Sequence, residues 1–277
     1  MTNPQLHPLE INAKTKEPFL RLRKHKNIIL TPPRQEDASS LVPILNDPLV
    51  HESLSGPPYP YTLGKLFSTF GATKGVSVEL SDHGYEFIGL KRKLADEIMK
   101  ELEDAKDDPT LKIVKGCPVT YLREVKENGS DVFIGSLDIT TCVYGEVMGP
   151  DGVDWENKKK REDENNSLKT GDDRIVWCFG GKPLLTCIRQ LIYIHLLPDY
   201  LAASHHRQGI MTDAVDTMLH EWAIPRMNVR HMLFYVIEGN EGSVKVFLRN
   251  GFKMKATYKD HYEVKGKMRG VHVLEYS

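Results

Sequence analysis

The hydrophobic pattern of this chain changes period along its length, so it predicts both helices and strands. Apolar residues spaced three or four positions apart are typical of amphipathic helices. They occur in residues 35–45, 90–102 and 210–223. Short apolar runs between turn-forming residues are typical of strands. They occur in residues 27–31, 118–123, 132–139, 184–197 and 231–237. The Asn128-Gly129 turn predicts a hairpin.

Two segments depart from this pattern. Residues 1–26 are polar with scattered prolines, so we expect a flexible, loosely held N-terminal arm before a single domain over residues 27–277. Between about residues 145 and 173 the chain carries a dense run of charges of both signs. Such a run is typical of a solvated loop. We therefore expect a charged loop insertion that interrupts the domain.

The composition bounds the class of protein. Hydrophobic residues make up 40% and charged residues 27% of the 277 positions, as in a folded globular protein. The net charge of -1 provides no overall field toward nucleic acid or anionic lipid. No apolar stretch reaches the roughly 18 residues of a membrane span, and the N-terminus lacks the apolar core of a secretory signal. We expect a cytoplasmic monomer or homodimer with no nucleic-acid or membrane partner.

The cysteines show no CxxC spacing, and we expect reduced, mostly buried thiols. They are Cys117, Cys142, Cys178 and Cys187. No group of residues has the spacing of a metal site, so we expect no metal.

One helix start has the chemistry of an anion site. The stretch HHRQGIMTDAV, residues 205–215, places basic and amide side chains before a glycine that opens an amphipathic helix. Amides in the first turn of a helix lack partners and carry partial positive charge, so they suit a phosphate. Gly209 lets a ligand approach the backbone, and Arg207 with the histidines adds charge. Neither the GxxxxGKS/T of a P-loop nor the GxGxxG of a dinucleotide fold is present. A plain helix start with a glycine turn is the alternative.

The next segments add a second pattern. The strand at residues 231–237 leads into NEGSVKVFLRNGF, a short helix closed by Asn250-Gly251. With HRQGIMTDAV, this order of motifs resembles the GNAT family of N-acetyltransferases, in particular the branch of the ribosomal-protein alanine acetyltransferases. IILTPPRQEDASSLVPILNDPLV and SGPPYPYT are similar to the start of that branch. The resemblance covers most of residues 27–62 and 118–276.

The resemblance implies a fold and a reaction. The fold is the α/β (α+β type) acyl-CoA N-acyltransferase fold, a mixed, mostly antiparallel, V-splayed sheet flanked by helices. The reaction moves an acetyl group from acetyl-CoA, the cosubstrate, to the primary amine of a protein N-terminus or a small molecule. It proceeds by direct attack, and no metal takes part.

The resemblance also implies cofactor contacts. His206 occupies the first position of the family's pyrophosphate loop, Gly209 matches its glycine, and Met211 replaces its last small residue. The pantetheine arm would pair with the strand at residues 192–197, and Asn240 matches a position near the thioester. The implied contacts are Ile194, Leu196, His206, Arg207, Gln208, Gly209, Ile210, Met211, Thr212, Asn240, Ser243 and Phe247.

Acetyl transfer needs a base for the amine and a proton for the departing thiolate. Many family members carry a tyrosine acid seven residues after the asparagine, where this chain has Phe247. In the branch a serine three residues after it can serve, and Ser243 stands there. Glu238 and His195, at strand ends, are the candidate bases.

Each of these assignments has a plainer alternative. Ser243 could cap its helix, and Glu238 and His195 could be structural or solvated. Tyr59 and Tyr61 border the acceptor site by resemblance, or else form a packed turn.

Two other functions remain open. Phe247, His206 and Met211 favour a catalytically inactive acyl-CoA-binding or regulatory module. A nucleotide-binding α/β domain that prefers ATP or NAD is a weaker alternative.

Overall fold

The computed structural model describes residues 3–54, 57, 59–62, 83–144, 147–149, 152–180, 199–264 and 266–277. The strands are β1 (Glu10–Ile11), β2 (Pro18–Arg21), β3 (Ile28–Thr31), β4 (Tyr121–Val125), β5 (Asp131–Ser136), β6 (Ile139–Thr141), β7 (Met148–Gly149), β8 (Gly152–Val153), β9 (Val176–Phe179), β10 (Tyr200–Leu201), β11 (His231–Ile237), β12 (Lys253–Val264) and β13 (Lys267–Tyr276). The α-helices are α1 (Ala38–Asn46), α2 (Pro48–His51), α3 (His83–Asp104), α4 (Trp155–Ser167), α5 (Ile210–Thr217), α6 (Ile224–Met227) and α7 (Glu241–Arg249). Short 3-10 turns are η1 (Pro4–Leu6), η2 (Gln35–Asp37) and η3 (Ala203–His205), and the π-helical η4 (Met218–Ala223) joins α5 to α6.

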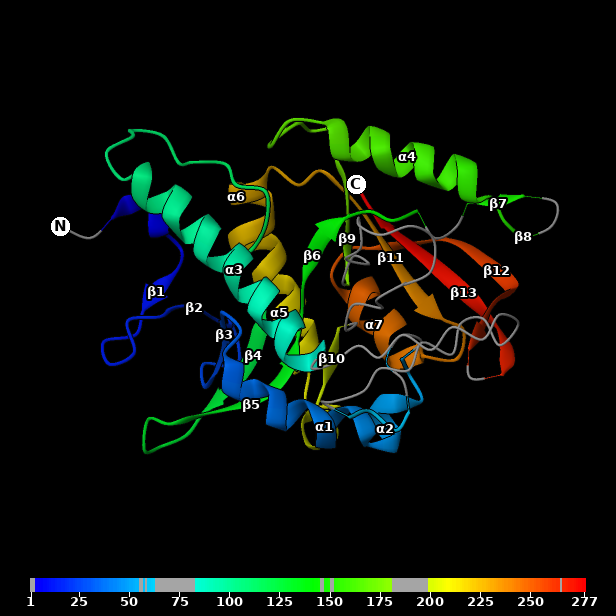
Figure 1. Cartoon of the computed structure of the whole chain (residues 1–277), viewed down its shortest axis with the longest axis horizontal. Coiled ribbons are helices and arrows are strands. Elements are labelled where there is room, and N and C mark those ends of the chain that lie inside the picture. The colour runs from blue at the N-terminus through cyan, green and yellow to red at the C-terminus, as the bar shows by residue number, and fades with distance from the viewer. Residues whose placement is uncertain are drawn as a thin grey trace.

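The strands form a mixed, mostly antiparallel arrangement flanked by helices, which confirms the expected fold class (Figure 1). The six-stranded sheet has the order β1-β2-β3-β4-β5-β10, and the five-stranded sheet has the order β12-β13-β11-β9-β6. Among the strands the structure describes, only β9 and β11 pair in parallel. The described strands therefore divide into two main sheets, where one splayed sheet was expected.

The two sheets meet along β5 and β6, which follow one another across residues 137–138. β10 pairs with β5 opposite residues 135–136, and β9 pairs with β6 opposite residues 139–141. β9 and β10 thus lie end to end beside one continuous stretch of chain. The run at residues 181–198 that separates them in sequence lies outside the described residues, and it contains the whole of the expected strand 184–197.

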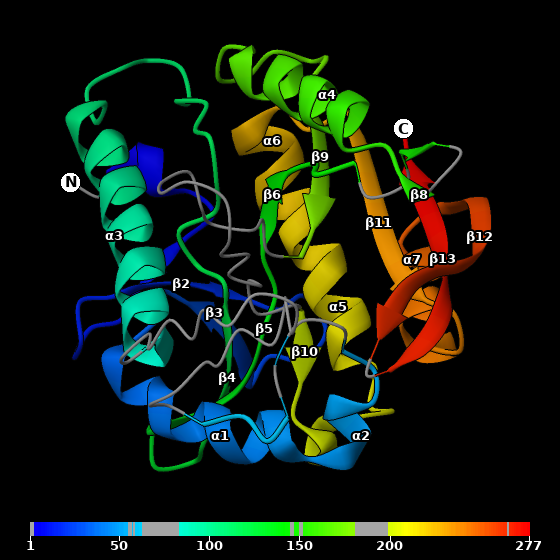
Figure 2. The same cartoon turned by 45° about the vertical axis from the view of Figure 1, so that its right-hand side comes forward.

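The sheets part between β10 and β11. β9 pairs with β11 only through residues 231–233, and β10 is the last strand of its sheet. In the described chain, no strand therefore pairs with both β10 and the later residues of β11, and the two sheets separate there. Figure 2 shows β10 and the lower end of β11 apart, with α5 between them in that view.

The N-terminal segment differs from the expected loose arm. β1 and β2 extend the six-stranded sheet beyond β3, and the core includes Leu9, Phe19, Leu20 and Leu22. Arg226 of α6 donates from Nη1 to the carbonyl oxygens of Gln5 at 2.6 Å and His7 at 2.5 Å. Strands of two and four residues are too short to give a periodic pattern, so the sequence did not predict them.

The charged insertion also differs from expectation, because its charged run forms α4. Lys159 and Asp163 pair one turn apart on the exposed surface, an arrangement that supports a solvated helix. Buried Asn165 docks the helix on β9: its side chain donates to the carbonyl oxygen of Val176 at 2.7 Å and accepts from its amide at 2.9 Å.

α3 confirms the predicted helix but only part of its apolar stripe. Ile98 and Leu102 are fully buried, whereas Leu90 and Leu94 are 41% and 42% exposed. No helix in the described part of the chain is long and apolar enough to cross a bilayer. Cys117, Cys142 and Cys178 are buried thiols, and Cys187 lies outside the described residues.

Candidate functional site

The start of α5 has the backbone geometry of an anion cradle. Gly209 is the N-cap, in the left-handed region with φ 80°, and no side chain caps the helix. The first-turn amides of Ile210, Met211 and Thr212 consequently meet no capping acceptor, and they carry the positive end of the helix dipole. A Cβ at Gly209 would find only the His25 ring within 4 Å, at 3.8 Å. The site therefore leaves room for an anion at the backbone.

The side chains before Gly209 mainly hold the loop. His206 Nε2 donates to the carbonyl oxygen of Leu201 at 2.8 Å, and Gln208 Nε2 donates to that of Ser204 at 2.9 Å. Arg207 adopts a left-handed φ of 61° and is exposed. Of the polar side chains expected to reach a ligand, Arg207 is thus the one best placed to do so.

His25, a residue that sequence reasoning missed, stands behind this turn. Its Nδ1 bonds to the carboxylate of Asp213 at 2.8 Å and its Nε2 bonds to the carbonyl oxygen of Gln208 at 3.0 Å. Both partners only accept hydrogen bonds, so both form together when the imidazole carries two protons. The ring therefore ties the turn before Gly209 to the carboxylate of Asp213. No local signal marked it, because His25 lies in the segment expected to be an arm.

Asp213 fixes this arrangement from inside α5. Its side chain is 1% exposed and also accepts from the backbone amides of Lys24 at 2.9 Å and His25 at 2.7 Å. Thr217, one turn later and equally buried, accepts from the amide of Arg23 at 3.1 Å. Both residues lie between the apolar positions of this amphipathic helix, a spacing that by itself indicates the solvent face. The N-terminal segment covers that face instead.

The first turn of α7 uses its polar residues for capping. Asn240 is the N-cap, and its side-chain oxygen accepts from the amide of Ser243 at 3.1 Å. Asn240, and not Ser243, therefore caps the helix. The hydroxyl of Ser243, which is partly buried, is not needed for the cap.

Phe247 lies in the core, which differs from the implied cofactor contact. Its side chain is 2% exposed, and its ring stacks on Phe234 with centroids 3.5 Å apart. Phe179 and Phe252 meet it edge-on at 5.3 and 5.1 Å. The spacing correctly placed Phe247 on the inner side of a helix, but it could not show that other aromatic rings cover it.

Glu238 is poorly suited to act as a base. The ion pair with Lys259 lowers the pKa of its carboxyl group below the ordinary value. Gly270 lies directly under this carboxylate, because a Cβ there would stand 2.3 Å from Glu238 Oε2. The other candidate base, His195, and the implied cofactor contacts Ile194 and Leu196 lie outside the described residues.

The tyrosines of the expected acceptor site differ in exposure. Tyr61 is buried, its backbone exchanges two 2.8 Å hydrogen bonds with the side chain of Asn46, and burial raises the pKa of its phenol to about 12. Tyr59 is 61% exposed, and its ring packs at a tilt against that of His51 with centroids 4.1 Å apart. Tyr61 is thus a packed turn residue, and Tyr59 is open to a ligand.

Asp199 is a second residue that the sequence did not mark. It immediately precedes β10, and its Oδ1 accepts from the amide of Asp138 at 2.9 Å. Its Oδ2 is buried and meets no hydrogen-bond donor among the described residues. Burial raises the pKa of this carboxyl group to about 8. In sequence it is only a polar residue after a proline.

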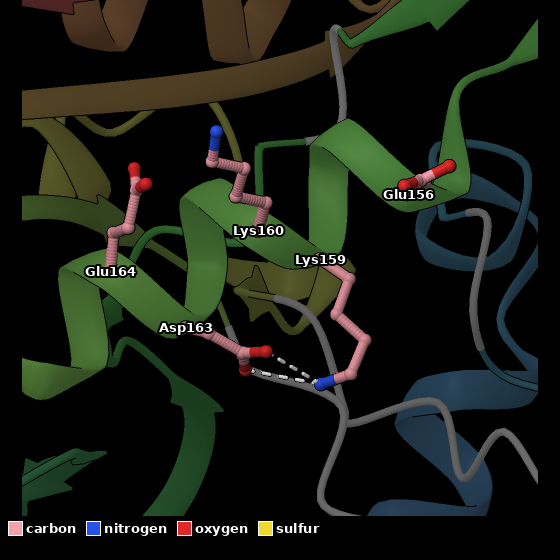
Figure 3. A pocket seen from close by; sticks show the side chains of 5 residues that line it. All are labelled: Glu156, Lys159, Lys160, Asp163 and Glu164. Carbon is pink, nitrogen blue, oxygen red and sulfur yellow. Dashed lines mark hydrogen bonds and ion pairs between the residues drawn. The ribbon is translucent and has the colours of Figure 1, made fainter.

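A separate hollow beside α4 has no such chemistry. The described side chains that line it all come from this one helix, and Lys159 and Asp163 neutralise each other there (Figure 3). Within the described ranges, no group of three or more His, Cys, Asp or Glu side chains is placed to hold a metal ion.

No protein-family model and no curated protein matches the chain. Solved structures similar to it are GNAT acetyltransferases. One, from Bacillus anthracis, is 8% identical over 93% of this chain and 96% of that chain, with a TM-score of 0.48. The ribosomal-protein-S5-alanine acetyltransferase from Vibrio fischeri is 12% identical over 92% and 94%, with a TM-score of 0.48. Mycobacterium smegmatis RimJ, in complex with CoA-disulfide, is 15% identical over 94% and 85%, with a TM-score of 0.43. At these values the similarity concerns the general fold alone.

Proposed function

We propose that this protein is an N-acetyltransferase that moves the acetyl group of acetyl-CoA to a primary amine. One observation carries the proposal: α5 begins at a left-handed glycine, without a side-chain cap, and a short loop with the turn η3 joins it to β10, the last strand of its sheet. An open strand edge can pair with a ligand that carries amides, and an uncapped helix start can hold a diphosphate. Pantetheine and pyrophosphate are joined in this order in CoA.

The residues present fit such a ligand. The amides of Ile210, Met211 and Thr212 supply donors, Arg207 is an exposed cation, and the doubly bonded His25 supports the turn from behind. Beside them, the edge of β10 continues as extended chain to Ala202, whose amide donates to the carbonyl oxygen of Ile134 at 2.7 Å. These groups bind and orient the ligand, and the backbone donors among them do not depend on the side chains of His206 and Met211.

The chemistry then requires proton transfers by the chain. Bound acetyl-CoA supplies an activated acetyl group, and an acceptor amine with a pKa near ~10 must lose a proton before it can attack. The attack is direct, so no acetyl group is held covalently by the enzyme. The hydroxyl of Ser243 is the candidate proton donor to the departing sulfur. Tyr59, exposed in the segment before Tyr61, borders the acceptor, which is a protein N-terminus or a small amine.

Titration calorimetry tests the cofactor directly. Acetyl-CoA is expected to bind with a micromolar dissociation constant, and ATP and NAD are expected to bind far more weakly. Equal or stronger binding of ATP or NAD would favour the nucleotide-binding alternative. No binding of acetyl-CoA to the folded protein would remove the proposal.

Substitution of Gly209 locates the pyrophosphate. Gly209→Asp is expected to weaken acetyl-CoA binding at least about tenfold relative to Gly209→Asn, because it adds a negative charge beside the first-turn amides that would hold the phosphates. The two side chains have the same shape, and both tolerate the left-handed region. Calorimetry at low and high salt measures the difference, which salt should reduce.

Gly129→Asp is the control for position. Gly129 has nearly the same φ, 79° against 80° for Gly209, but lies in the β4–β5 hairpin. Its aspartate variant should bind acetyl-CoA as the wild type does. Equal affinities of the Gly209→Asp and Gly209→Asn variants would place the pyrophosphate elsewhere.

The second candidate function is an acyl-CoA-binding module without turnover. It is favoured by Phe247, whose position in the core leaves no tyrosine acid there. Release of free CoA thiol on addition of amines separates the two functions. An enzyme releases one thiol for each amide formed, whereas a module binds acetyl-CoA and releases none.

A further inference from the structure

Asp199 stands at the junction of the two sheets. β9 ends at Phe179, β10 begins at Tyr200, and both pair with the stretch that runs through Asp138. The amide of Gly180 donates to the carbonyl oxygen of Asp138 at 3.0 Å, and the amide of Asp138 donates to Asp199 Oδ1 at 2.9 Å. The Asp199 carboxylate is therefore held between the end of β9 and the start of β10, opposite Asp138.

The chain direction relates this junction to the proposed cofactor. The phosphate cradle at Gly209 follows the C-terminal end of β10, and Asp199 precedes its N-terminal end. A pantetheine arm that starts at the cradle and pairs along the β10 edge extends toward Asp199. On this path the thioester at the end of the arm would lie toward the Asp199 end of β10.

The fold does not explain why the second carboxylate oxygen of Asp199 is buried. Oδ2 is buried and has no hydrogen-bond partner among the residues that the structure describes. Buried carboxylate oxygens are normally satisfied, because leaving one without a donor is costly. An ammonium group is the kind of donor that this atom lacks.

The surrounding charges set how tightly Asp199 holds a proton. Burial is the largest influence and raises the pKa of Asp199 to about 8. The amides of Asp138 and Gly180 and the ammonium group of Lys91 lower this pKa, whereas the carboxylate of Asp138 raises it. Lys91, from α3, forms an ion pair with Asp138. The buried thiol of Cys178, on β9, also interacts electrostatically with Asp199. Asp138, Lys91 and Cys178 are thus side chains of the described elements whose charge or titration acts on Asp199.

We infer that Asp199 is the general base of the acetyl transfer, with Oδ2 accepting the proton that the acceptor ammonium loses. This inference rests on the proposed function. The neutral amine then attacks the acetyl carbonyl carbon, a C–N bond forms, and the C–S bond breaks. CoA leaves as a thiolate and is protonated to the thiol, and Asp199 returns its proton to solvent. No oxidant, reductant or further reactant is needed.

Asp199→Asn removes the base while keeping the shape of the side chain. Turnover with a reactive amine is expected to fall at least about 100-fold, with the affinity for acetyl-CoA in calorimetry unchanged within twofold. Asp163→Asn, the same chemical change on the exposed face of α4, should leave both quantities unchanged. Asp199→Asn turnover within threefold of wild type would overturn the inference.

The pH dependence provides a second readout. A base works only when deprotonated, so wild-type activity should be low below the pKa of Asp199 and rise with pH through about 8. Carbon NMR of labelled aspartate should show one carboxyl resonance that titrates there and is missing from Asp199→Asn. A resonance that titrates near pH 4 would contradict the assignment.

The outcomes separate the two proposals. If the folded wild-type protein does not bind acetyl-CoA, the proposed function is wrong. Acetyl-CoA binding without turnover on any amine keeps the cofactor site and overturns Asp199 as a base.

Lys91 is a positioning residue in this scheme, since it acts through Asp138 and through its charge. Lys91→Met removes a cation that favours the ionised carboxylate, so the midpoint of the pH–activity profile should move upward. Lys91→Arg should restore it. A purely structural role for Lys91 would lower activity at every pH without moving the midpoint.

Discussion

Phe247→Ala is expected to lower the free energy of unfolding by about 3–5 kcal/mol, as is usual for a buried phenylalanine. The ring stacks on Phe234 and meets Phe179 and Phe252 edge-on, so its removal leaves a cavity among aromatic side chains that cannot close easily. Urea unfolding followed by tryptophan fluorescence measures the change. Leu248→Ala, at the next position of α7 but 45% exposed, is the control and should cost well under 1 kcal/mol.

Phe247→Tyr places a tyrosine at the position where the GNAT family, which the sequence resembles, often carries its acid. The added hydroxyl would enter a cluster of phenylalanine rings, where an unpaired polar group costs about 1–3 kcal/mol. We expect loss of stability and no gain in turnover. A tyrosine variant that is as stable as wild type and faster would show that this ring reaches the reacting atoms.

Asp213→Ala is expected to lower the free energy of unfolding by about 4 kcal/mol, since it removes a buried charged acceptor and leaves its donors unpaired. The lost partners are the amides of Lys24 and His25 and the ring of His25. Because His25 also bonds to the carbonyl oxygen of Gln208, acetyl-CoA affinity should fall as well. Chemical unfolding and calorimetry provide the two measurements.

Asp216→Ala is the matched control for Asp213. Asp216 lies on the same helix and pairs with the half-exposed Arg23 at 3.2 Å, an interaction that contributes about 1 kcal/mol or less. Its loss should leave the turn before α5 intact. Equal destabilisation by the two substitutions would mean that Asp213 does not anchor the N-terminal segment.

The sequence predicted those elements that generate a local pattern. The helix after Gly209, the strand at residues 231–237 and the helix closed by Asn250-Gly251 all carry regular apolar spacing, and the structure forms α5, β11 and α7 there. The hairpin at Asn128-Gly129 is present, with Gly129 in the left-handed region. Each of these depends on neighbours only a few positions away, which is why periodicity and turn chemistry suffice.

Contacts between distant segments were not predictable in this way. Asp213 follows the spacing of a solvated residue, and only residues 24–25 make it a buried one. Asp199 becomes a candidate base because Asp138 and the meeting of the sheets enclose its carboxylate. Phe247 occupies a functional position by spacing and a core position by packing. The sequence shows which residue type stands at each position, but which of these residues are buried depends on contacts between distant segments.

The N-terminal segment has a consequence for biosynthesis. The bond from Arg226 to the carbonyl oxygen of Gln5 spans 221 positions, and that from the amide of Arg23 to Thr217 spans 194. At about 5–20 residues per second, a ribosome takes roughly 10–40 seconds to supply these partners. Until then Leu22, fully buried in the finished protein, lacks those members of its hydrophobic cluster that α5, η4 and α6 supply. Residues 5–23, which are synthesised long before residues 217–226, thus reach these native contacts late, and during that interval they are natural targets for a chaperone.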